Sequence, residues 1–402
     1  MRDSRPHVVL CWFMDDWGKY GRTYEQVARE LARSDEIAHV TCVLPPVWVP
    51  PQDSRPPIRV REWSRKLIAV TPQPHVLPAG FRPFRLRQWV NNHLANLSLA
   101  ALLKLHGYQR DNTLLWLFPP GPYAEVLERL IPHRYQLMHV IDNNALLEHG
   151  DAAQREFSRA QYLRLAEKSA RIYVNSELNQ AWFSPMHPQV SFFENAVDPC
   201  FFGQPRLCNN KPRLAYLGWV TERTDVSILE RLADHRKDWL ISLAAPDNQA
   251  SRRYLHALLQ RANVSWVRDL PYQDSPQFLS EADVCLIPHL DTPYSRSMSP
   301  LKLFQYLATG RAVVSTRVAG VDRWADYVSI ADTPDEFIQA VESLLRNDTI
   351  QASQARIDAM LKETWRQRVS AMLEPVLDDW RHGSGKPHAL GSPGPAGFNM
   401  KS

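Results

Sequence analysis

The sequence predicts an α/β protein built from two doubly wound parallel sheets, and three observations support this. Short apolar runs alternate with amphipathic stretches along most of the chain, as expected for successive βα units. Several of these runs are continuously apolar, which is typical of parallel strands buried on both faces. The 402 residues are enough for two domains of ordinary size.

The first half begins with a predicted buried strand at 8–13 and an amphipathic helix at 24–33. Further strands are predicted in this half at 40–44, 113–118, 136–141 and 171–175. Helices are expected at about 85–106 and 154–169, and Ser176 stands where an N-cap would begin another helix. Because parallel sheets bind ligands beyond the carboxyl ends of their strands, we expect the functional residues there.

The second half repeats the pattern after a polar linker at 209–212. Its strands are predicted at 213–217, 239–243, 263–267, 283–287, 312–316 and near 327–330. A helix at 334–346 should close the sheet. The Gly-, Pro- and Ser-rich end of the chain should be disordered. We therefore expect a first domain, a linker, a second domain, a helix that crosses back to the first domain and a disordered tail, at 1–190, 191–212, 213–362, 363–382 and 383–402 respectively.

One segment of the second half has the pattern of a complete loop, helix, turn and strand. Ser299 suits an N-cap, because its hydroxyl can accept an orphan backbone N–H, and Pro300 suits the first helical position. Gly310 suits the left-handed residue that ends a helix. Apolar residues recur on one helix face at Leu301, Phe304 and Ala308.

Lys302 and Gln305 fall on a second face of the same helix. A cation in the first turn opposes the helix dipole, so Lys302 is poorly placed for stability. It is well placed to share an anion with the free N–H groups of the helix N-terminus. Gln305, one turn further on, suits a neutral hydroxyl of the same ligand. The alternative is an ordinary amphipathic helix with a solvated lysine.

This unit resembles the donor-site helix of glycosyltransferases with two facing Rossmann-like domains, the GT-B architecture. In that family a Pro-x-Lys-x-x-Glu-Tyr-x-Ala-x-Gly-x-Pro-Val-Val segment binds a nucleotide-sugar. Further segments between about 190 and 375 resemble the donor domain, namely 193–198, 214–218, 225–229 and 282–288. Trp17, Gly18, Arg22 and the helix near Tyr24 resemble the start of bacterial polysaccharide glycosyltransferases. The resemblance implies a deep interdomain cleft and nucleotide-sugar use.

The resemblance also implies a donor site around the segment that begins near residue 298. Lys302 is the leading diphosphate ligand, and Arg223 would add a second cation or, alternatively, pair with a neighbouring carboxylate on the surface. Ser299 and Met298, which precede the helix, would offer backbone N–H groups, and Gly218, in the Gly loop after the first strand of this domain, would also belong to the donor site. The nucleotide base, uracil by family expectation with guanine as an alternative, would lie against Leu270 and Tyr272. In this family no metal or other cofactor is needed, so none is expected here.

Many retaining members carry two glutamates separated by seven residues, and here Ser297 and Gln305 stand in their places. The resemblance is then to xanthan-type glucuronosyltransferases, which invert the anomeric centre. An inverting enzyme needs a base in the first domain. Asp142, at the end of a predicted strand, is the best candidate, with Asp16 and Asp15 as rivals. A cap or brace for a neighbouring loop is the structural alternative for Asp142.

The acceptor opening is expected to include Trp17, Gly18, Arg22 and His139. Arg22 could instead be an ordinary helix-face residue. His139 and the nearby His149 could instead be packed imidazoles, which is the commoner state of histidines in such positions.

Net charge of +4 conceals a basic segment at 55–87, where eight Lys and Arg residues face a single Glu. Aromatic residues are interleaved with them at Trp63, Phe81, Phe84 and Trp89. Basic and aromatic residues together suit an anionic membrane surface. A solvated Pro-rich loop is the first alternative, and nucleic-acid binding is disfavoured.

The five cysteines are expected to be reduced core residues rather than metal or redox centres, because they include no Cys-x-x-Cys pair. The opening residues lack the core and cleavage site of a signal peptide, and no apolar run is long enough for a membrane span. We expect a cytoplasmic protein, with the inner face of the cytoplasmic membrane as a contact surface.

Together these patterns predict a metal-independent glycosyltransferase. It would move a sugar from a nucleotide-sugar to a glycan or a polyprenyl-diphosphate-linked acceptor, with inversion favoured, in surface or exopolysaccharide biosynthesis. One alternative is a non-catalytic partner subunit that binds nucleotide-sugar or glycan. Another is a glycosyltransferase that acts on a soluble small molecule.

Overall fold

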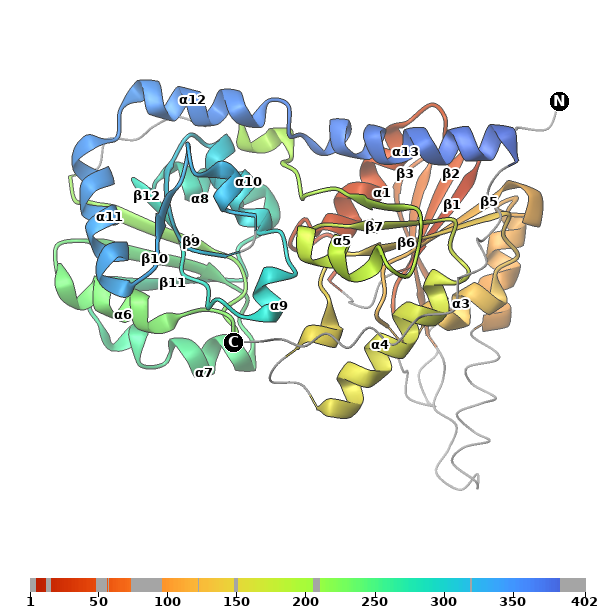
Figure 1. Ribbon diagram of the computed structural model, residues 1–402, viewed down its shortest axis with the longest axis horizontal. Helices are drawn as coiled ribbons and strands as arrows, with labels where there is room; N and C mark the ends of the chain where they lie inside the picture. The colour runs from red at the N-terminus through yellow and green to blue at the C-terminus, as the bar shows by residue number, and fades with distance from the viewer. Residues whose placement is uncertain are drawn as a thin grey trace.

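The computed structural model describes the residues 5–11, 16–47, 56, 58–73, 96–121, 123–147, 151–204, 210–318 and 320–383. Figure 1 shows two α/β lobes side by side, each with a sheet flanked by helices. Two long helices run along one side of both lobes. The predicted fold class is confirmed.

The first sheet has eight strands in the order β3-β4-β2-β1-β5-β6-β7-β8. Their bounds are β1 His7–Cys11, β2 His39–Val43, β3 Ile58–Ser64, β4 Leu67–Pro72, β5 Thr113–Leu117, β6 Tyr135–Val140, β7 Arg171–Val174 and β8 Val190–Phe192. Neighbouring strands are parallel except β3, which pairs antiparallel with β4. The central strands carry apolar residues on both faces, and each face has its own core. Val8 and Leu10 belong to one core cluster, whereas Val9 belongs to the other.

Helices cover both faces of this sheet. Their bounds are α1 Thr23–Arg33, α3 Ala124–Leu130, α4 Ala152–Ala166 and α5 Glu177–Phe183, and residues 96–105 are also helical. The Ser176 side chain accepts a hydrogen bond from the Asn179 N–H, which confirms its prediction as an N-cap.

The second sheet has six parallel strands in the order β11-β10-β9-β12-β13-β14. The strands are β9 Arg213–Leu217, β10 Leu240–Ala245, β11 Val264–Arg268, β12 Val284–Ile287, β13 Ala312–Thr316 and β14 Ser329–Ala331. The helices of this lobe are α6 Val226–His235, α7 Gln249–Leu255, α8 Ser275–Ser280, α9 Pro293–Arg296, α10 Leu301–Ala308 and α11 Pro334–Asn347. The strand order reverses between β9 and β12, and such reversals create a crevice at the carboxyl ends of the strands.

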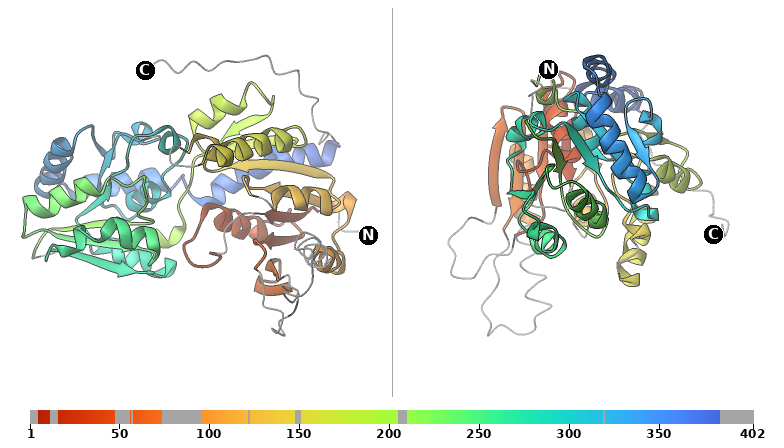
Figure 2. Two further views of the ribbon diagram at one scale, coloured as in Figure 1. Left: turned by 90° about the horizontal axis from the view of Figure 1, so that it is seen from below. Right: turned by 90° about the vertical axis from the view of Figure 1, so that its left-hand side faces the viewer.

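The last two helices return the chain to the first lobe. Helix α12 (Ile350–Met360) lies over the second lobe, and α13 (Trp365–His382) lies over the first, against α1 (Figures 1 and 2). The Tyr173 hydroxyl donates to the carbonyl of Met372 at 2.6 Å, and the Tyr135 hydroxyl donates to Asp379 at 2.7 Å. The predicted crossing helix is therefore present, and it is anchored by buried tyrosines of the first sheet.

The two connections between the lobes touch one another. The Val197 N–H donates to the Glu363 carbonyl at 2.9 Å, and the Trp365 N–H donates to the Val197 carbonyl at 3.1 Å. These bonds form an isolated parallel bridge between Val197 and Thr364. The outgoing and returning chain thus pass between the lobes at the same place.

Within the basic segment, the structure differs from the predicted Pro-rich connection. Residues 58–72 form the β3–β4 hairpin at an outer edge of the first sheet, which Figure 2 shows at the side of the molecule. Strand β4 is buried, whereas β3 is mostly exposed, with Trp63 44% exposed. Neither strand was predicted. In β3, charged residues interrupt the alternation of apolar and polar side chains. Residues 74–95 and 384–402 lie outside the described part of the chain, and with them Phe81, Phe84, Trp89, the first part of the helix expected at 85–106, and the expected tail beyond Gly383.

Candidate active site

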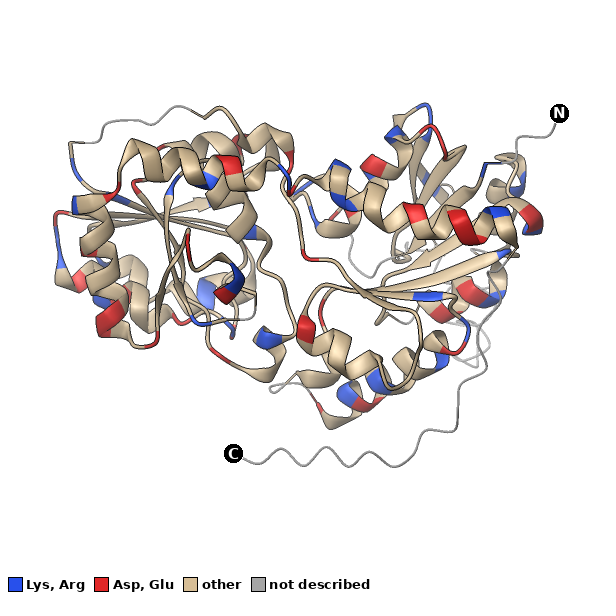
Figure 3. Ribbon diagram, turned by 45° about the horizontal axis from the view of Figure 1, so that its top comes forward, with Lys and Arg blue, Asp and Glu red and all other residues tan. Residues whose placement is uncertain are grey.

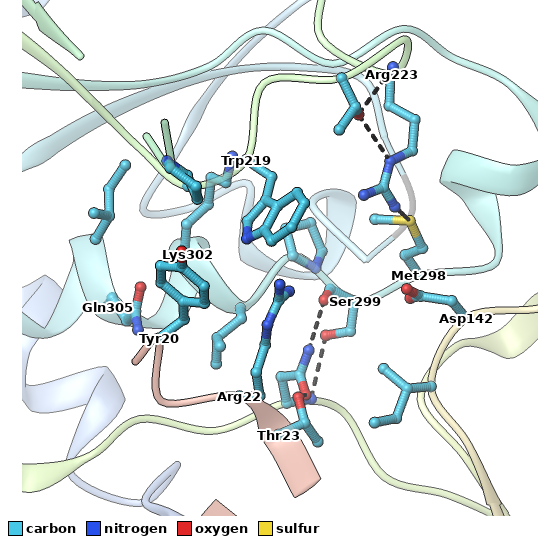
Figure 4. Close-up of a pocket in the computed structure, with 18 of the residues that line it drawn as sticks. Tyr20, Arg22, Thr23, Asp142, Trp219, Arg223, Met298, Ser299, Lys302 and Gln305 are labelled. Atoms are coloured by element: carbon cyan, nitrogen blue, oxygen red, sulfur yellow. Dashed lines mark hydrogen bonds between the residues drawn. The ribbon is translucent and has the colours of Figure 1, made fainter. Parts of the chain in front are cut away.

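A pocket of about 240 Å³ lies between the two lobes, at the carboxyl ends of both sheets. The first lobe lines it with residues after β5 and β6 and with the turn before α1, and the second lobe with residues after β9, β10 and β12 and with the start of α10. Figure 4 shows the side chains of both lobes pointing toward a common space. This is the position at which doubly wound sheets bind their ligands.

Lys302 extends from the first turn of α10 into this pocket. Its Nζ lies 4.0 Å from the centroid of the Tyr216 ring and 3.2 Å from His289 Nε2. Burial lowers the pKa of Lys302. Burial and the nearby lysine also hold the pKa of His289 well below its usual value. A neutral His289 can accept a hydrogen bond from the Lys302 ammonium, and this bond holds the ammonium near the N-terminus of α10.

The start of α10 differs from the prediction in one respect. Ser299 was expected as the N-cap, but Pro300 occupies that position and no described side chain caps the helix. The Ser299 hydroxyl instead accepts from the Asn195 N–H at 3.2 Å, and the Ser299 carbonyl accepts from Asn195 Nδ2 at 2.7 Å. Ser299 therefore ties the loop to the interdomain linker, and the helix N-terminus is left to face the pocket. Gly310 ends the helix with φ +71°, as predicted.

The loop after β9 approaches Lys302 closely. Gly218 has φ +126°, and a Cβ added there would lie 3.3 Å from the Nζ of Lys302. Only glycine combines this backbone conformation with the space that the lysine occupies. Trp219 follows directly and places its indole ring over the pocket, where Figure 4 shows it beside Arg22 and Tyr20.

Arg22 enters the pocket from the turn before α1. Its Nε donates to Asp16 at 2.8 Å, and the hydroxyl of Tyr24 donates to the other oxygen of Asp16 at 2.5 Å. The guanidinium carbon lies 5.0 Å from the Trp219 ring centroid and 5.5 Å from that of Tyr20. The arginine is thus fixed by one carboxylate and two aromatic rings, with one ring contributed by the other lobe.

Asp142 follows β6 and lies on the same side of the pocket as Met298 (Figure 4). Its backbone carbonyl accepts from the Tyr162 hydroxyl at 3.0 Å, which fixes the turn. Burial raises the pKa of its carboxyl above the usual 3.8, whereas the positive charges of Arg223 and Arg22 act in the opposite direction. A carboxylate whose pKa is raised by burial is a stronger base than an exposed one, as a general base requires.

Arg223 stands at the outer side of the pocket. Its guanidinium carbon lies 5.2 Å from the Tyr294 ring centroid, and its Nη1 lies 2.7 Å from the sulfur of Met298. The alternative of surface pairing with a neighbouring carboxylate does not occur among the described ion pairs. Arg223 therefore presents a largely uncompensated charge near Asp142.

Leu270 and Tyr272, which are predicted to contact a nucleotide base, also line the pocket. Tyr272 also bridges the lobes, because its hydroxyl accepts from Gln26 Nε2 at 3.0 Å. A Cβ at Gly21 would lie 2.2 Å from the Tyr272 ring, so the glycine allows this close approach. Gln305, one turn after Lys302 on α10, also lines the pocket and is only 5% exposed.

The chain is similar in sequence to known proteins over about a third of its length. Residues 212–347, about a third of the chain, match the family model described as glycosyl transferases group 1. This match covers most of the second lobe. A putative teichuronic acid biosynthesis glycosyltransferase, TuaH of Bacillus subtilis (strain 168), is 28% identical over 137 residues, which are 33% of this chain and 34% of that protein. The match thus spans about a third of the curated relative.

Solved structures resemble the whole chain. Sucrose-phosphate synthase from Thermosynechococcus elongatus has a TM-score of 0.71 at 15% identity, over 94% of this chain and 100% of that one. The alpha,alpha-trehalose 6-phosphate synthase of Burkholderia multivorans has a TM-score of 0.63 at 12% identity, over 94% and 99%. At such identities the likeness shows the shared fold, so both lobes together have the GT-B fold. The predicted resemblance is confirmed.

The second lobe supplies every residue predicted for the donor side of the pocket. Those residues that line it are Gly218, Arg223, Leu270, Tyr272, Met298, Ser299, Lys302 and Gln305. From the first lobe, Arg22 and Asp142 also line it. Asp16 is not among the lining residues, and its carboxylate is engaged by Arg22 and Tyr24. Asp15 and His149 lie outside the described part of the chain.

Three residues predicted for the acceptor opening do not line this interdomain pocket. Trp17 is buried in the core of the first lobe, with its ring centroid 5.6 Å from that of Trp63. Gly18 donates its N–H to Glu25 at 2.9 Å. His139 lies in an aromatic cluster, 4.9 Å from the Phe118 ring centroid, and burial lowers its pKa to about 3. His139 is therefore a packed imidazole, which was the alternative expectation for it, because its side chain points from the strand into the core.

The pocket also contains residues that were not predicted, namely Tyr20, Trp219 and His289. A signal was present for two of them. Trp219 directly follows the Gly218 loop, and His289 follows the apolar strand 282–288 at its carboxyl end. Tyr20 carries no such signal, because its place depends on a Trp from the other lobe.

Within the described residues, no group of His, Cys, Asp and Glu could hold a metal ion. Cys11, Cys42, Cys200 and Cys285 are free thiols, and Cys200 is the exposed one. No helix among the described residues is long and apolar enough to cross a membrane.

Proposed function

We propose that this chain is a glycosyltransferase that transfers a sugar from a nucleoside-diphosphate sugar, with UDP as the favoured nucleotide. The observation that carries the proposal is the position of Lys302 at the uncapped N-terminus of α10, next to Gly218, inside a pocket shared by both lobes. A free helix N-terminus and an ammonium group together form a diphosphate site. The group 1 domain match supports the same class of donor.

The donor would lie along the wall formed by the second lobe. Its diphosphate would contact Lys302 and the first turn of α10, and Arg22 would approach the same charge from the first lobe. Gln305 offers both a donor and an acceptor to the ribose hydroxyls. The base would pack against Leu270 and Tyr272, which line the same pocket.

The transfer step needs a base and stabilisation of the leaving group. In the proposed reaction the acceptor oxygen attacks the anomeric carbon, the bond between that carbon and the diphosphate oxygen breaks, and the acceptor proton passes to Asp142. The negative charge left on the diphosphate is stabilised by Lys302, Arg22 and the helix N-terminus. Attack from the face opposite the leaving group inverts the anomeric centre, which is the outcome we propose. Because these cations already face the diphosphate, the proposal includes catalysis without a metal ion.

The acceptor would be a glycan or a polyprenyl-diphosphate-linked glycan of a surface or exopolysaccharide pathway. The support is the similarity to a relative whose name places it in teichuronic acid biosynthesis. The exposed, basic β3 strand at one edge of the first lobe supports contact with an anionic membrane. Elsewhere, Figure 3 shows positive and negative segments alternating along the outer helices of both lobes.

The test is a transfer assay with purified full-length protein. A panel of UDP- and GDP-sugars is incubated with lipid-linked and soluble acceptors, with and without EDTA, and nucleoside diphosphate and product are measured. The proposal expects release of nucleoside diphosphate that depends on an acceptor and persists in EDTA. Donor binding without turnover for every acceptor would contradict it.

That outcome would favour a second candidate, a non-catalytic partner subunit that binds nucleotide-sugar. One observation favours it: Ser297 replaces a carboxylate expected in retaining members, and its hydroxyl donates to the Tyr294 carbonyl at 2.7 Å and accepts from the Asn143 N–H at 3.3 Å. Ser297 is therefore a structural residue that holds the loop. Substitution of Asp142 distinguishes the enzyme from the non-catalytic subunit, because only the enzyme needs a carboxylate at this position.

A further inference from the structure

Asn195 lies in the linker between the lobes, after β8, and it also lines the donor pocket. The residue is only 3% exposed, and its N–H, its Nδ2 and its Oδ1 all form hydrogen bonds. Its side-chain amide is fixed in one orientation, because turning it over would set its oxygen against a carbonyl oxygen. Asn195 is therefore a fixed part of the pocket wall.

Two of these bonds hold the loop that precedes α10. The Asn195 N–H donates to the Ser299 hydroxyl at 3.2 Å, and Asn195 Nδ2 donates to the Ser299 carbonyl at 2.7 Å. The chain then continues into the first turn of α10, which carries Lys302. Within that turn, Leu301 packs against a core cluster of the first lobe. The start of α10 thus takes its position from the linker and from the first lobe.

The third bond holds the start of α1. The Thr23 hydroxyl donates to Asn195 Oδ1 at 2.7 Å, and Thr23 is only 7% exposed. Thr23 directly follows Arg22, which occupies the N-cap position of α1. Figure 4 shows Thr23 close to Ser299, although they belong to different lobes. The turn that carries Arg22 is therefore tied to the linker as well.

A single side chain thus connects the two cations that enter the pocket from different lobes. Arg22 and Lys302 each lie within three residues of a hydrogen-bond partner of Asn195. Asn195 is also two residues from Val197, where the two chain crossings between the lobes are bridged. A point so close to the crossings moves little when the lobes rotate, so it is a suitable reference for both cations.

We propose that Asn195 is a positioning residue of the donor site, which holds Arg22 and Lys302 at the spacing that one diphosphate requires. This inference rests on the proposed function, since it takes both cations as ligands of the diphosphate. Charges stabilise a ligand best when they are fixed before it arrives, because ordering them afterwards costs part of the binding free energy. Asn195 acts through Thr23 and Ser299 and need not touch the diphosphate.

The test is a double-mutant cycle on the full chain, in which isothermal titration calorimetry measures the affinity for UDP, or for GDP if UDP does not bind. Arg22→Ala should weaken binding about tenfold in the wild type. In an Asn195→Ala background the same change should cost less than about threefold, because the turn that carries the arginine is then no longer tied to α10. Additive losses would show that the two residues act independently, and would overturn the proposal.

The Thr23 hydroxyl gives a second test, which holds even if Asn195→Ala fails to fold. Thr23→Val removes the bond to Asn195 and keeps the shape of the side chain, so it should weaken nucleotide binding about threefold or more. Thr23→Ser keeps the hydroxyl and should bind like the wild type. Equal binding by Thr23→Val and Thr23→Ser would overturn the proposal. So would a further loss on adding Thr23→Val to Asn195→Ala.

Asn263→Ala is the matched control for a buried asparagine that only supports the fold. Asn263 Nδ2 donates to three backbone carbonyls of the second lobe, and the residue does not line the donor pocket. The control should lower the melting temperature and leave nucleotide affinity unchanged. A loss of affinity in Asn263→Ala as large as that in Thr23→Val would mean that affinity follows stability, and would overturn the proposal.

Failure of this inference is distinguishable from failure of the proposed function. Coupled losses of nucleotide affinity without transfer to any acceptor would count against the proposed transfer and support the role of Asn195. Transfer with additive losses would overturn the role of Asn195 alone. A wild-type protein that binds neither UDP nor GDP would overturn the donor site and this role together.

Discussion

The guanidinium carbon of Arg22, in the first lobe, lies over the Trp219 ring of the second lobe, 5.0 Å from its centroid, and Asp16 accepts a hydrogen bond from Arg22 Nε. Both residues line the donor pocket. Planar guanidinium groups combine such stacking with a directed hydrogen bond, which a lysine cannot do. The position of a charge from one lobe is thus set partly by a ring from the other.

Arg22→Lys should therefore lower kcat/KM by about tenfold or more although it keeps the charge. The matched control is Arg29→Lys. Arg29 also pairs with a carboxylate, Glu25, and stacks at 5.2 Å on a tryptophan, Trp63, but it lies outside the pocket. Steady-state kinetics should show little change for the control. Equal losses in the two variants would mean that Arg22 acts only through folding stability.

Lys302→Ala should weaken UDP binding by roughly 10- to 100-fold, which corresponds to about 1.5–3 kcal/mol for a hydrogen bond to a charged group. Isothermal titration calorimetry measures the affinity, and circular dichroism should show an unchanged fold. Lys237→Ala is the control, since Lys237 pairs with Asp234 on the surface of the same lobe. An unchanged UDP affinity in Lys302→Ala would remove Lys302 from the donor site.

UDP affinity should also depend on alkaline pH through Lys302. Only the ammonium form binds phosphate well, and burial lowers the pKa of Lys302 below its usual 10.5. The affinity should therefore be constant near neutral pH and decline as pH rises through this lowered pKa. Lys302→Arg keeps its charge throughout this range, so the decline that belongs to the lysine should be absent from it. Parallel curves for the two proteins would contradict this prediction.

Asp142→Asn should reduce transfer by about 10²- to 10⁴-fold, the usual contribution of a general base, and leave UDP binding intact. The variant also removes a charge whose burial is unfavourable, so its melting temperature should be equal to or above that of the wild type. Asp16→Asn is the comparison, because its carboxylate holds Arg22 and it should lose activity only partly. A larger loss in Asp16→Asn would exchange the two assignments.

The pH profile of transfer offers an independent check on Asp142. Its pKa is raised by burial, and the base must be deprotonated to accept a proton. As pH falls, kcat/KM should therefore decline through a pKa above 3.8, and the decline should be absent from the residual activity of Asp142→Asn. A profile that stays flat down to the acid denaturation of the protein would argue against a carboxylate base.

Membrane contact should depend on the β3 strand and the turn that follows it. Each basic residue near an anionic surface contributes about 1 kcal/mol, so reversing Arg59, Arg61 and Arg65 to Glu should abolish co-sedimentation with phosphatidylglycerol vesicles. The control is a triple reversal on the second lobe, at Arg231, Arg236 and Lys237. A wild-type protein that neither binds vesicles nor changes its activity with lipid would favour a soluble acceptor.

The α10 segment shows how far local patterns reach. Gly310 and the positions of Lys302 and Gln305 followed from spacing, because a helix fixes which residues share a face. The N-cap did not follow, because Asn195, over a hundred residues earlier in the chain, takes both the hydroxyl and the carbonyl of Ser299. A capping rule based on neighbouring residues cannot predict that a distant residue, placed there by the tertiary fold, will bind the capping side chain instead.

The same limit explains the first-lobe residues. Asp142 could be placed because it ends a strand whose carboxyl end must face the other lobe. His139 belongs to the same strand, but its side chain does not face the other lobe. It packs against Phe118 and Trp116 in the core. Trp17 likewise meets Trp63, from a hairpin that the charge pattern had hidden. To tell which side chains of a strand face the core, one must know how that strand aligns with its neighbours, and this alignment could not be read from the sequence.

The bridge between Val197 and Thr364 limits how the lobes can move. Both chain crossings pass through this one place and are hydrogen-bonded there. Two covalent links at a single point act as a hinge, so the lobes can rotate about it but cannot slide apart. Any opening between the lobes would then be a rotation, and it would break hydrogen bonds that span them, such as the one from Gln26 to Tyr272.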